Sequence, residues 1–177
     1  MKKILNIIKV ALSVMFFISP AAFAADLKVG DPAPTFELMD QFDKTISLNS
    51  EKGKWVVLYF YPKDQTPGCT TEACSFRDNI NKLIAQKAVV LGVSLDDRDS
   101  HVAFAKKHDL PFSLLADTDG QIAAQYGSLL DFKLFKMAKR HSFIIDPNGN
   151  IAKIYRSVDP DNHVREVMAD LKTLQNS

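Results

Sequence analysis

The chain has 177 residues, and its 22 basic and 21 acidic side chains give a formal net charge of only +1. Because the positive and negative charges nearly cancel, there is no electrostatic reason to expect nucleic acid or an anionic membrane as a partner. Two cysteines are too few for a disulfide scaffold, although a lone pair can form one inert structural bridge. The length suits one domain with a full hydrophobic core.

The first 24 residues have the pattern of a secretory signal peptide. Lys2 and Lys3 precede an apolar stretch at 10–18, and an Ala-x-Ala cleavage site ends at Ala24. The stretch is shorter than the roughly 20 residues of a membrane-spanning helix. We therefore expect export with cleavage near Ala24 rather than an uncleaved anchor. Loss of three of the 22 basic side chains would leave 19 against 21 acidic ones, a net charge of −2 for the mature domain, 25–177.

The remaining sequence alternates between strand and helix patterns. Residues 36–48 indicate a short hairpin or extended arm, and the apolar run at 55–61 is typical of a buried strand. A helix is expected over about 69–86, because apolar residues at helical spacing form one face. The residues of this face are Ala73, Phe76, Ile80, Leu83 and Ile84.

The middle of the chain repeats this alternation. A second buried strand is expected at 88–94, followed by a helix that reaches His108. Asp99 or Ser100 is expected to cap this helix, because short oxygen-bearing side chains accept hydrogen bonds from the first free N–H groups. A third strand is expected at 112–116.

The last part of the chain changes topology. A turn at 117–120 leads into a short helix that Gly127 ends. Two strands, 141–145 and 151–156, flank a Pro-Asn-Gly hairpin signal. The final amphipathic helix carries Val164, Val167, Met168, Leu171 and Leu174. A β-α-β-α-β half followed by a hairpin and a helix predicts an α/β protein with a thioredoxin-like fold, in which helices flank a central mixed sheet and an N-terminal extension precedes it.

Both cysteines lie where the strand at 55–61 gives way to a helix. Cys69 follows a loop rich in proline and glycine, at the start of the helical pattern. A thiol there meets unpaired backbone N–H groups and the positive end of the helix dipole, which both favour thiolate over thiol. Helical periodicity places Cys69 on the face of Phe76 and Ile80, whereas Cys74 lies off that face.

The pattern Pro62-x-x-x-Thr66-x-x-Cys69 resembles the active-site signature of peroxiredoxins. Cys74, five positions further on, resembles the resolving cysteine of the bacterioferritin-comigratory (peroxiredoxin Q) branch. The match is specific, because four residues recur at fixed offsets in the strand–loop–helix context that the chemistry needs. Further similarity extends from about Asp26 to the C-terminus.

This resemblance implies a thiol peroxidase that reduces hydrogen peroxide or organic hydroperoxides with no metal or organic cofactor. It also implies a monomer that is re-reduced by a thioredoxin-like protein, which for an exported enzyme would itself be exported. No nucleic acid and no stable membrane association after processing are expected.

The same resemblance gives individual residues their expected roles. Cys69 would attack the peroxide as a thiolate. Arg140, which opens the strand at 141–145, matches the arginine that peroxiredoxins place beside this sulfur, and it would also donate to the peroxide. Thr66 would hydrogen-bond the thiolate and orient the substrate, while Pro62 would cover the site and limit access of water.

Cys74 would then condense with the sulfenic acid formed on Cys69. Five residues along an ideal helix separate Cα atoms by roughly 8.6 Å, whereas a disulfide needs them within roughly 7 Å. The turn between the two cysteines must therefore unwind after oxidation. We predict a site that is folded when reduced and locally unfolded when oxidised.

Two other functions use paired thiols. A copper-handling metallochaperone of the thioredoxin fold would use both cysteines and His141, since thiolates and imidazole select copper. Such proteins resemble Cys-x-x-x-Cys, however, and thiol-disulfide oxidoreductases have Cys-x-x-Cys. The other histidines, His101, His108 and His163, have no metal-ligand spacing and are expected to be solvated on the surface.

The segment between Gly127 and Arg140 is unusually apolar. Its apolar residues are Leu129, Leu130, Phe132, Leu134, Phe135 and Met137. We expect a short amphipathic helix packed on the core, because apolar residues at helical spacing usually mean burial. The alternative is an entrance for lipid or alkyl hydroperoxides, or a binding site for the reductant.

Overall fold

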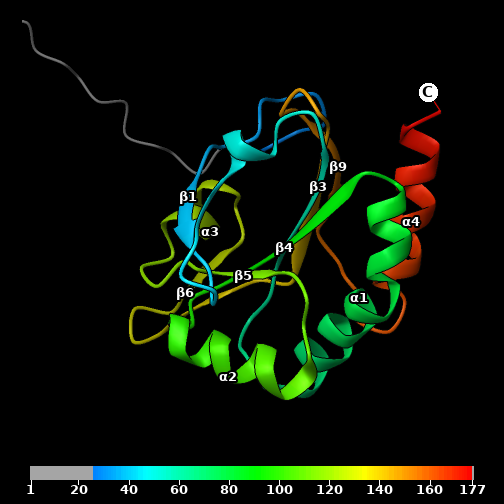
Figure 1. The fold of residues 1–177 in the computed structure, drawn as a ribbon. Helices are drawn as coiled ribbons and strands as arrows, with labels where there is room; N and C mark the ends of the chain where they lie inside the picture. The colour runs from blue at the N-terminus through cyan, green and yellow to red at the C-terminus, as the bar shows by residue number, and fades with distance from the viewer. Residues whose placement is uncertain (1–25, 177) are drawn as a thin grey trace, which may run out of the picture.

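A five-stranded mixed sheet forms the centre of the computed structural model, which describes residues 26–176 (Figure 1). The predicted signal peptide lies outside the described residues. The strand order is β5-β4-β3-β8-β9; β3, β4 and β5 are parallel, whereas β8 is antiparallel to both of its neighbours. The strands are β3 (Trp55–Phe60), β4 (Ala88–Ser94), β5 (Ser113–Ala116), β8 (His141–Ile145) and β9 (Ile151–Tyr155). The predicted α/β architecture is confirmed.

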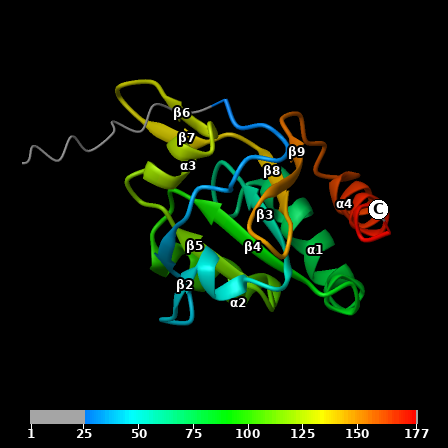
Figure 2. The ribbon, with the colours of Figure 1, turned by 90° about the horizontal axis from the view of Figure 1, so that it is seen from above.

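Successive side chains of β3 enter two different cores, as the alternation of a strand requires. Val57 and Tyr59 face α1 and α4, whereas Val56 and Leu58 face the opposite layer. Figures 1 and 2 show α1 and α4 on one side of the sheet, and α3 with the β1–β2 hairpin on the other. These elements are α1 (Pro67–Ala85), α2 (Arg98–His108), α3 (Gln121–Gln125), α4 (His163–Leu174), β1 (Glu37–Met39), β2 (Thr45–Ser47) and the 3-10 helix η1 (Leu48–Glu51).

The cap and face predictions need two corrections. The N-cap of α2 is Asp97, whose carboxylate accepts a hydrogen bond from the backbone N–H of Ser100 at 2.9 Å, so neither Asp99 nor Ser100 is the cap. Ile84 is exposed rather than part of the buried face of α1, because Leu83 already faces the core and the next residue points about 100° away from it.

The segment after Gly127 is a β-hairpin, so the expected amphipathic helix is wrong. Its strands are β6 (Leu129–Asp131) and β7 (Lys136–Ala138), which pair antiparallel. Within the hairpin, only Ala138 is fully buried. The turn carries Phe132 stacked on Phe135, with ring centroids 4.7 Å apart, and Leu134 at 96% exposure. Apolar residues at this tip therefore lie on the surface, where helical periodicity had predicted burial.

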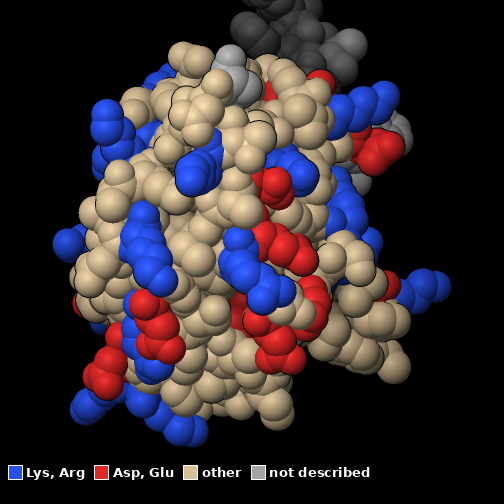
Figure 3. Space-filling view, turned by 90° about the vertical axis from the view of Figure 1, so that its right-hand side faces the viewer, with Lys and Arg blue, Asp and Glu red and all other residues tan. Residues whose placement is uncertain are grey.

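The surface carries charges of both signs. On the face that includes α4 and α1, acidic and basic side chains are interspersed (Figure 3). Lys153 of β9, for example, pairs with Asp170 of α4 at 3.2 Å. No helix within residues 26–176 is long and apolar enough to span a membrane.

Candidate active site

Strand directions bring Cys69 and Arg140 to the same edge of the sheet. Strand β3 leads through a short loop into α1, whose first turn contains Cys69. Because β8 runs antiparallel to β3, with His141 paired to Phe60, Arg140 lies beside the carboxyl end of β3. Its Nη2 donates to the sulfur of Cys69 at 3.2 Å. The pairing expected from the sequence is therefore present.

The first turn of α1 is built for a close approach to Cys69. Helix α1 begins at Pro67, two residues earlier than expected, and Thr66 is its N-cap residue. The amides of Gly68 and Cys69 have no acceptor earlier in the helix and add positive potential near the sulfur. A Cβ on Gly68 would lie 3.2 Å from Nη2 of Arg140, so glycine leaves room for the guanidinium.

A buried carboxylate completes this contact. Nη1 of Arg140 donates to Oε2 of Glu72, which lies one helical turn after Cys69 and is fully buried. Burial raises the pKa of Glu72 to about 7, although the charge and hydrogen bond of Arg140 oppose this shift. Burial alone would lower the pKa of Arg140, but the negative charges of Glu72 and Cys69 raise it. Arg140 therefore stays charged between the two groups.

Sequence reasoning missed Glu72, although a signal was available. A carboxylate three residues after Cys69 falls on the otherwise apolar face that includes Ala73 and Phe76. Charged side chains are almost never fully buried unless paired. A lone acid on such a face thus calls for a cationic partner, and Arg140 is that partner.

The prediction that the three remaining histidines are solvated is wrong for two of them. His101 and His163 are fully buried, and His108 is half-buried. His163 shares a hydrogen bond with the hydroxyl of Ser142 at 2.9 Å and lies 4.0 Å from Glu72. Burial and then the charge of Arg140 lower the pKa of His163 to about 4, so it is neutral near pH 7. Partners distant in sequence make this burial possible, and periodicity does not reveal them.

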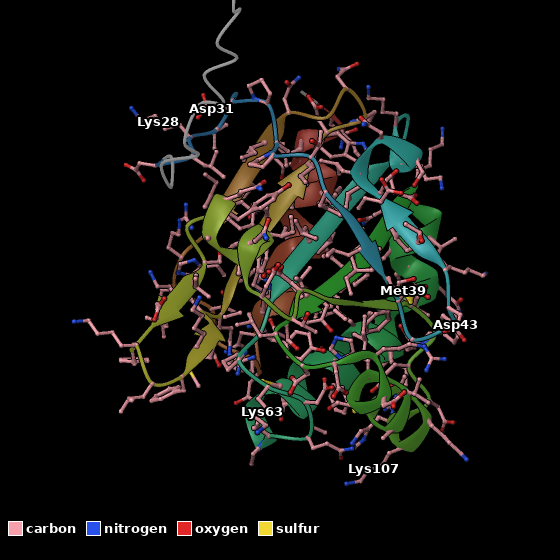
Figure 4. The ribbon with its side chains drawn as sticks, turned by 90° about the vertical axis from the view of Figure 1, so that its left-hand side faces the viewer. Lys28, Asp31, Met39, Asp43, Lys63 and Lys107 are labelled. Carbon is pink, nitrogen blue, oxygen red and sulfur yellow. The ribbon has the colours of Figure 1, made fainter. Side chains whose placement is uncertain are left out.

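A second buried network fixes the loop before α1. The carboxylate of Asp64 accepts hydrogen bonds from Tyr61 at 2.8 Å and from Ser100 at 2.7 Å, and it contacts His101 at 2.8 Å. Ser100 and His101 belong to α2, so the loop is tied to that helix. Figure 4 shows the loop with the labelled Lys63 at the same end of the molecule as α2.

The two remaining signature residues frame this loop. Pro62 is half-buried and lies two residues after the end of β3. The hydroxyl of Thr66 donates to the carbonyl oxygen of Lys63 at 2.9 Å and makes no helix-capping bond. The side chain of Thr66 thus makes a hydrogen bond within the loop, while its backbone carbonyl oxygen accepts a hydrogen bond from the N–H of Thr70 at 2.9 Å. The expected bond between its hydroxyl and the Cys69 thiolate stays a prediction.

Both cysteines are free and lie in one continuous helix. Cys69 is buried and Cys74 is half-buried, which is the difference that the periodicity predicted. Cys74 packs toward α2, where its sulfur lies 3.9 Å from Nδ1 of His108. This intact helix is the folded, reduced arrangement that we expected; unwinding after oxidation stays a prediction.

The geometry does not favour copper binding. His141, the histidine that this alternative requires, contacts the hydroxyl of Ser128 at 3.1 Å and the guanidinium of Arg156 at 3.0 Å. Burial and the charge of Arg156 lower its pKa to about 4. Within residues 26–176, no three His, Cys, Asp or Glu residues gather as a metal site.

Comparison with known proteins gives a consistent match. Residues 29–154 match the model of the AhpC/TSA family. A putative peroxiredoxin Bcp of Coxiella burnetii is 44% identical over 149 residues, which cover 82% of this chain and 99% of the relative. The crystal structure of the peroxidoxin BcpB from Mycobacterium tuberculosis is similar with a TM-score of 0.79 and 34% identity, covering 83% of this chain and 97% of that one. A Xanthomonas campestris bacterioferritin comigratory protein, described with alkyl peroxide reduction activity, has a TM-score of 0.75 and 31% identity, covering 84% and 98%.

Proposed function

Because the chain belongs to the AhpC/TSA family and is a thiol-dependent peroxidase of the thioredoxin fold, we propose that Cys69 is the thiol that attacks the peroxide. The contact of 3.2 Å between Nη2 of Arg140 and the Cys69 sulfur carries this proposal. A guanidinium and a helix N-terminus at one sulfur stabilise the thiolate, which is the nucleophilic form of cysteine.

In the proposed first step, the Cys69 thiolate attacks one oxygen of the peroxide. The S–O bond forms as the O–O bond breaks, and the departing oxygen takes a proton to leave as water or an alcohol. Arg140 stabilises the negative charge that develops on this oxygen, because its planar group has more than one donor. Cys69 is then a sulfenic acid, and the proposed partner for its condensation is Cys74.

In the second step, the first turns of α1 unwind and Cys74 forms a disulfide with Cys69, with release of water. The intact helix supports this requirement, since both thiols lie inside α1. Hydrogen peroxide and organic hydroperoxides are the proposed substrates; the alkyl peroxide activity of the Xanthomonas campestris relative supports the second class.

We further propose that the mature domain, 25–177, works as an exported monomer and that an exported thioredoxin-like protein reduces it. The N-terminal pattern that ends at Ala24 supports export. A monomer suffices, because both thiols of the cycle lie in one helix. Mass analysis of the protein recovered from the periplasm tests this, and a chain that still begins at Met1 in the cytoplasm would contradict it.

A stoichiometric titration tests the catalytic proposal. Reduced protein receives hydrogen peroxide in substoichiometric steps, and free thiols and intact mass are followed. We expect two thiols to be lost per peroxide, with a mass decrease of about two hydrogens from one internal disulfide. Tight copper binding with slow loss of thiols would instead favour the metallochaperone.

A further inference from the structure

The resolving sulfur has a hydrogen-bonding partner of its own. Cys74 Sγ lies 3.9 Å from Nδ1 of His108, the last residue of α2. The other ring nitrogen of His108, Nε2, is buried without a hydrogen-bond partner in the described part of the chain. Within residues 26–176, the sulfur of Cys74 is therefore the one hydrogen-bonding partner of this imidazole.

A guanidinium supports the same contact. Arg77, three residues after Cys74, donates from Nη1 to the backbone carbonyl oxygen of His108 at 2.7 Å. The pKa of Arg77 is raised, chiefly by its hydrogen bond to Asp78. The charged residues next to the pair along the chain are Arg77 and Asp78 in α1, and Lys107 and Asp109 on either side of His108.

The parts of α1 before and after Cys74 differ in how firmly they are packed against the core. After it, Phe76 is fully buried and stacks on Tyr59 at 4.8 Å, and Leu83 is also fully buried. Before it, Cys69, Glu72 and Ala73 are buried, but the other residues at 66–71 are half-buried or exposed and no large apolar side chain is among them. Unwinding the first part of α1 therefore exposes less apolar surface than unwinding the part beyond Cys74.

We propose that His108 holds Cys74 against α2 and takes its proton in the resolution step, while the chain around Cys69 moves to meet it. This inference rests on the proposed function, in which Cys74 is the resolving thiol. Nδ1 of His108 accepts the thiol proton, and the Cys74 thiolate attacks the sulfenic sulfur of Cys69. The S–S bond forms as the S–O bond breaks, and hydroxide leaves and takes up a proton to become water. The Cys74 sulfur is oxidised and the Cys69 sulfur is reduced.

The first test needs no turnover. In Cys69→Ser, Cys74 is the only thiol of the chain, and its alkylation by iodoacetamide is measured against pH. Adding His108→Gln should slow alkylation several-fold at pH values below the free cysteine pKa of about 8.5, where a base must take the thiol proton, whereas Lys106→Gln, an exposed change on the same helix, should not. An unchanged profile would overturn the proton transfer even if the peroxidase activity stands.

The second test follows the reaction itself. With both cysteines present, rapid quenching and mass spectrometry should show that His108→Gln slows disulfide formation by roughly tenfold or more, while sulfenic acid forms at the normal rate. Arg77→Gln leaves the imidazole in place and should slow disulfide formation by a smaller factor. This variant tests the proposal if His108→Gln does not fold. Resolution at the normal rate in both variants would overturn the proposal.

The third test concerns which cysteine moves. Hydrogen exchange of the oxidised protein should show loss of protection at 67–73, while 76–85 stay protected as in the reduced protein. Loss of protection along all of α1 would show that Cys74 leaves α2 and would overturn the proposal.

Discussion

Cys69 and Cys74 lie five residues apart on one helix, yet they contact different parts of the molecule. Cys69 is 1% exposed and receives a hydrogen bond from Arg140 at the start of β8. Cys74 is half-buried and faces His108 at the end of α2. The cation suits a sulfur that must be a thiolate before peroxide arrives, and the imidazole suits one that can lose its proton later. Tertiary contacts, rather than position along the helix, thus make the two thiols chemically different.

The largest expected effect comes from exchanging the sulfurs for oxygen. Cys69→Ser should abolish the fast reaction with peroxide, because the hydroxyl is a far weaker nucleophile. Cys74→Ser should keep the first step, since attack on peroxide does not need the second thiol. Its sulfenic acid should persist and advance to sulfinic acid under excess peroxide. Mass spectrometry of the Cys69 peptide would show added oxygen in place of a disulfide.

This pair of variants decides the assignment of the two thiols. If Cys74→Ser loses the first step as well, the resolving role is wrong. If Cys69→Ser retains the first step, the attacking thiol is not Cys69.

Arg140→Lys should be the next largest change. Lysine keeps the charge but loses the planar group that reaches Cys69 and Glu72 together. Loss of one donor to a developing oxyanion typically costs about 10²–10³ in rate, so we expect the second-order rate with peroxide to fall into that range. The pH of half-maximal alkylation of Cys69 should also move upward. Arg165→Lys, the same substitution at an exposed site on α4, is the control, and equal rates in both variants would mean that Arg140 has no part in the reaction with peroxide.

Glu72→Gln tests the buried acid near Cys69 by its effect on the free energy of unfolding. The pKa of Glu72 is raised from 4.5 to about 7 in the folded protein, so its contribution is fully present below pH 4.5 and is lost as pH rises to about 7. The free energy of unfolding of the variant, relative to the wild type, should therefore increase across this window. One pKa unit corresponds to about 1.4 kcal/mol, which sets the total gain at between about 1 and 3 kcal/mol for a group paired with Arg140.

Denaturant unfolding at several pH values measures this difference. His163 has the opposite linkage, because its pKa is lowered to about 4 and its contribution is lost as pH falls below about 6.5. In the wild type the pH dependences of Glu72 and His163 partly cancel. The free energy of unfolding of Glu72→Gln should therefore fall more steeply than that of the wild type as the pH is lowered. A constant difference from pH 4.5 to 7 would contradict the buried-acid assignment.

Local patterns predicted those parts of this site that lie close together in the sequence. The loop, the start of α1 and the burial of Cys69 followed from turn residues and helical periodicity, and Arg140 followed from resemblance. Glu72, His108 and His163 did not, because each acquires its role from a partner 21 to 68 residues away. The prediction for residues 129–138 failed for another reason. The exposed apolar tip of this hairpin has the composition of a core segment, and no local pattern shows which side of it meets solvent.

The smallest expected effect concerns the loop that presents Cys69. The hydroxyl of Thr66 donates to the carbonyl oxygen of Lys63, so Thr66→Val keeps the shape of the side chain and removes one hydrogen bond within this loop. A neutral hydrogen bond contributes about 1 kcal/mol, which corresponds to about fivefold in a rate if all of it is expressed there. We expect the peroxide reaction to slow by about that factor, while resolution by Cys74 is unchanged. Thr173→Val, which removes a similar bond to the carbonyl oxygen of Ala169 on α4, should lower stability without slowing the reaction. A rate loss of more than about a hundredfold in Thr66→Val would mean that its hydroxyl acts on the thiolate or the peroxide directly, as the sequence resemblance implied.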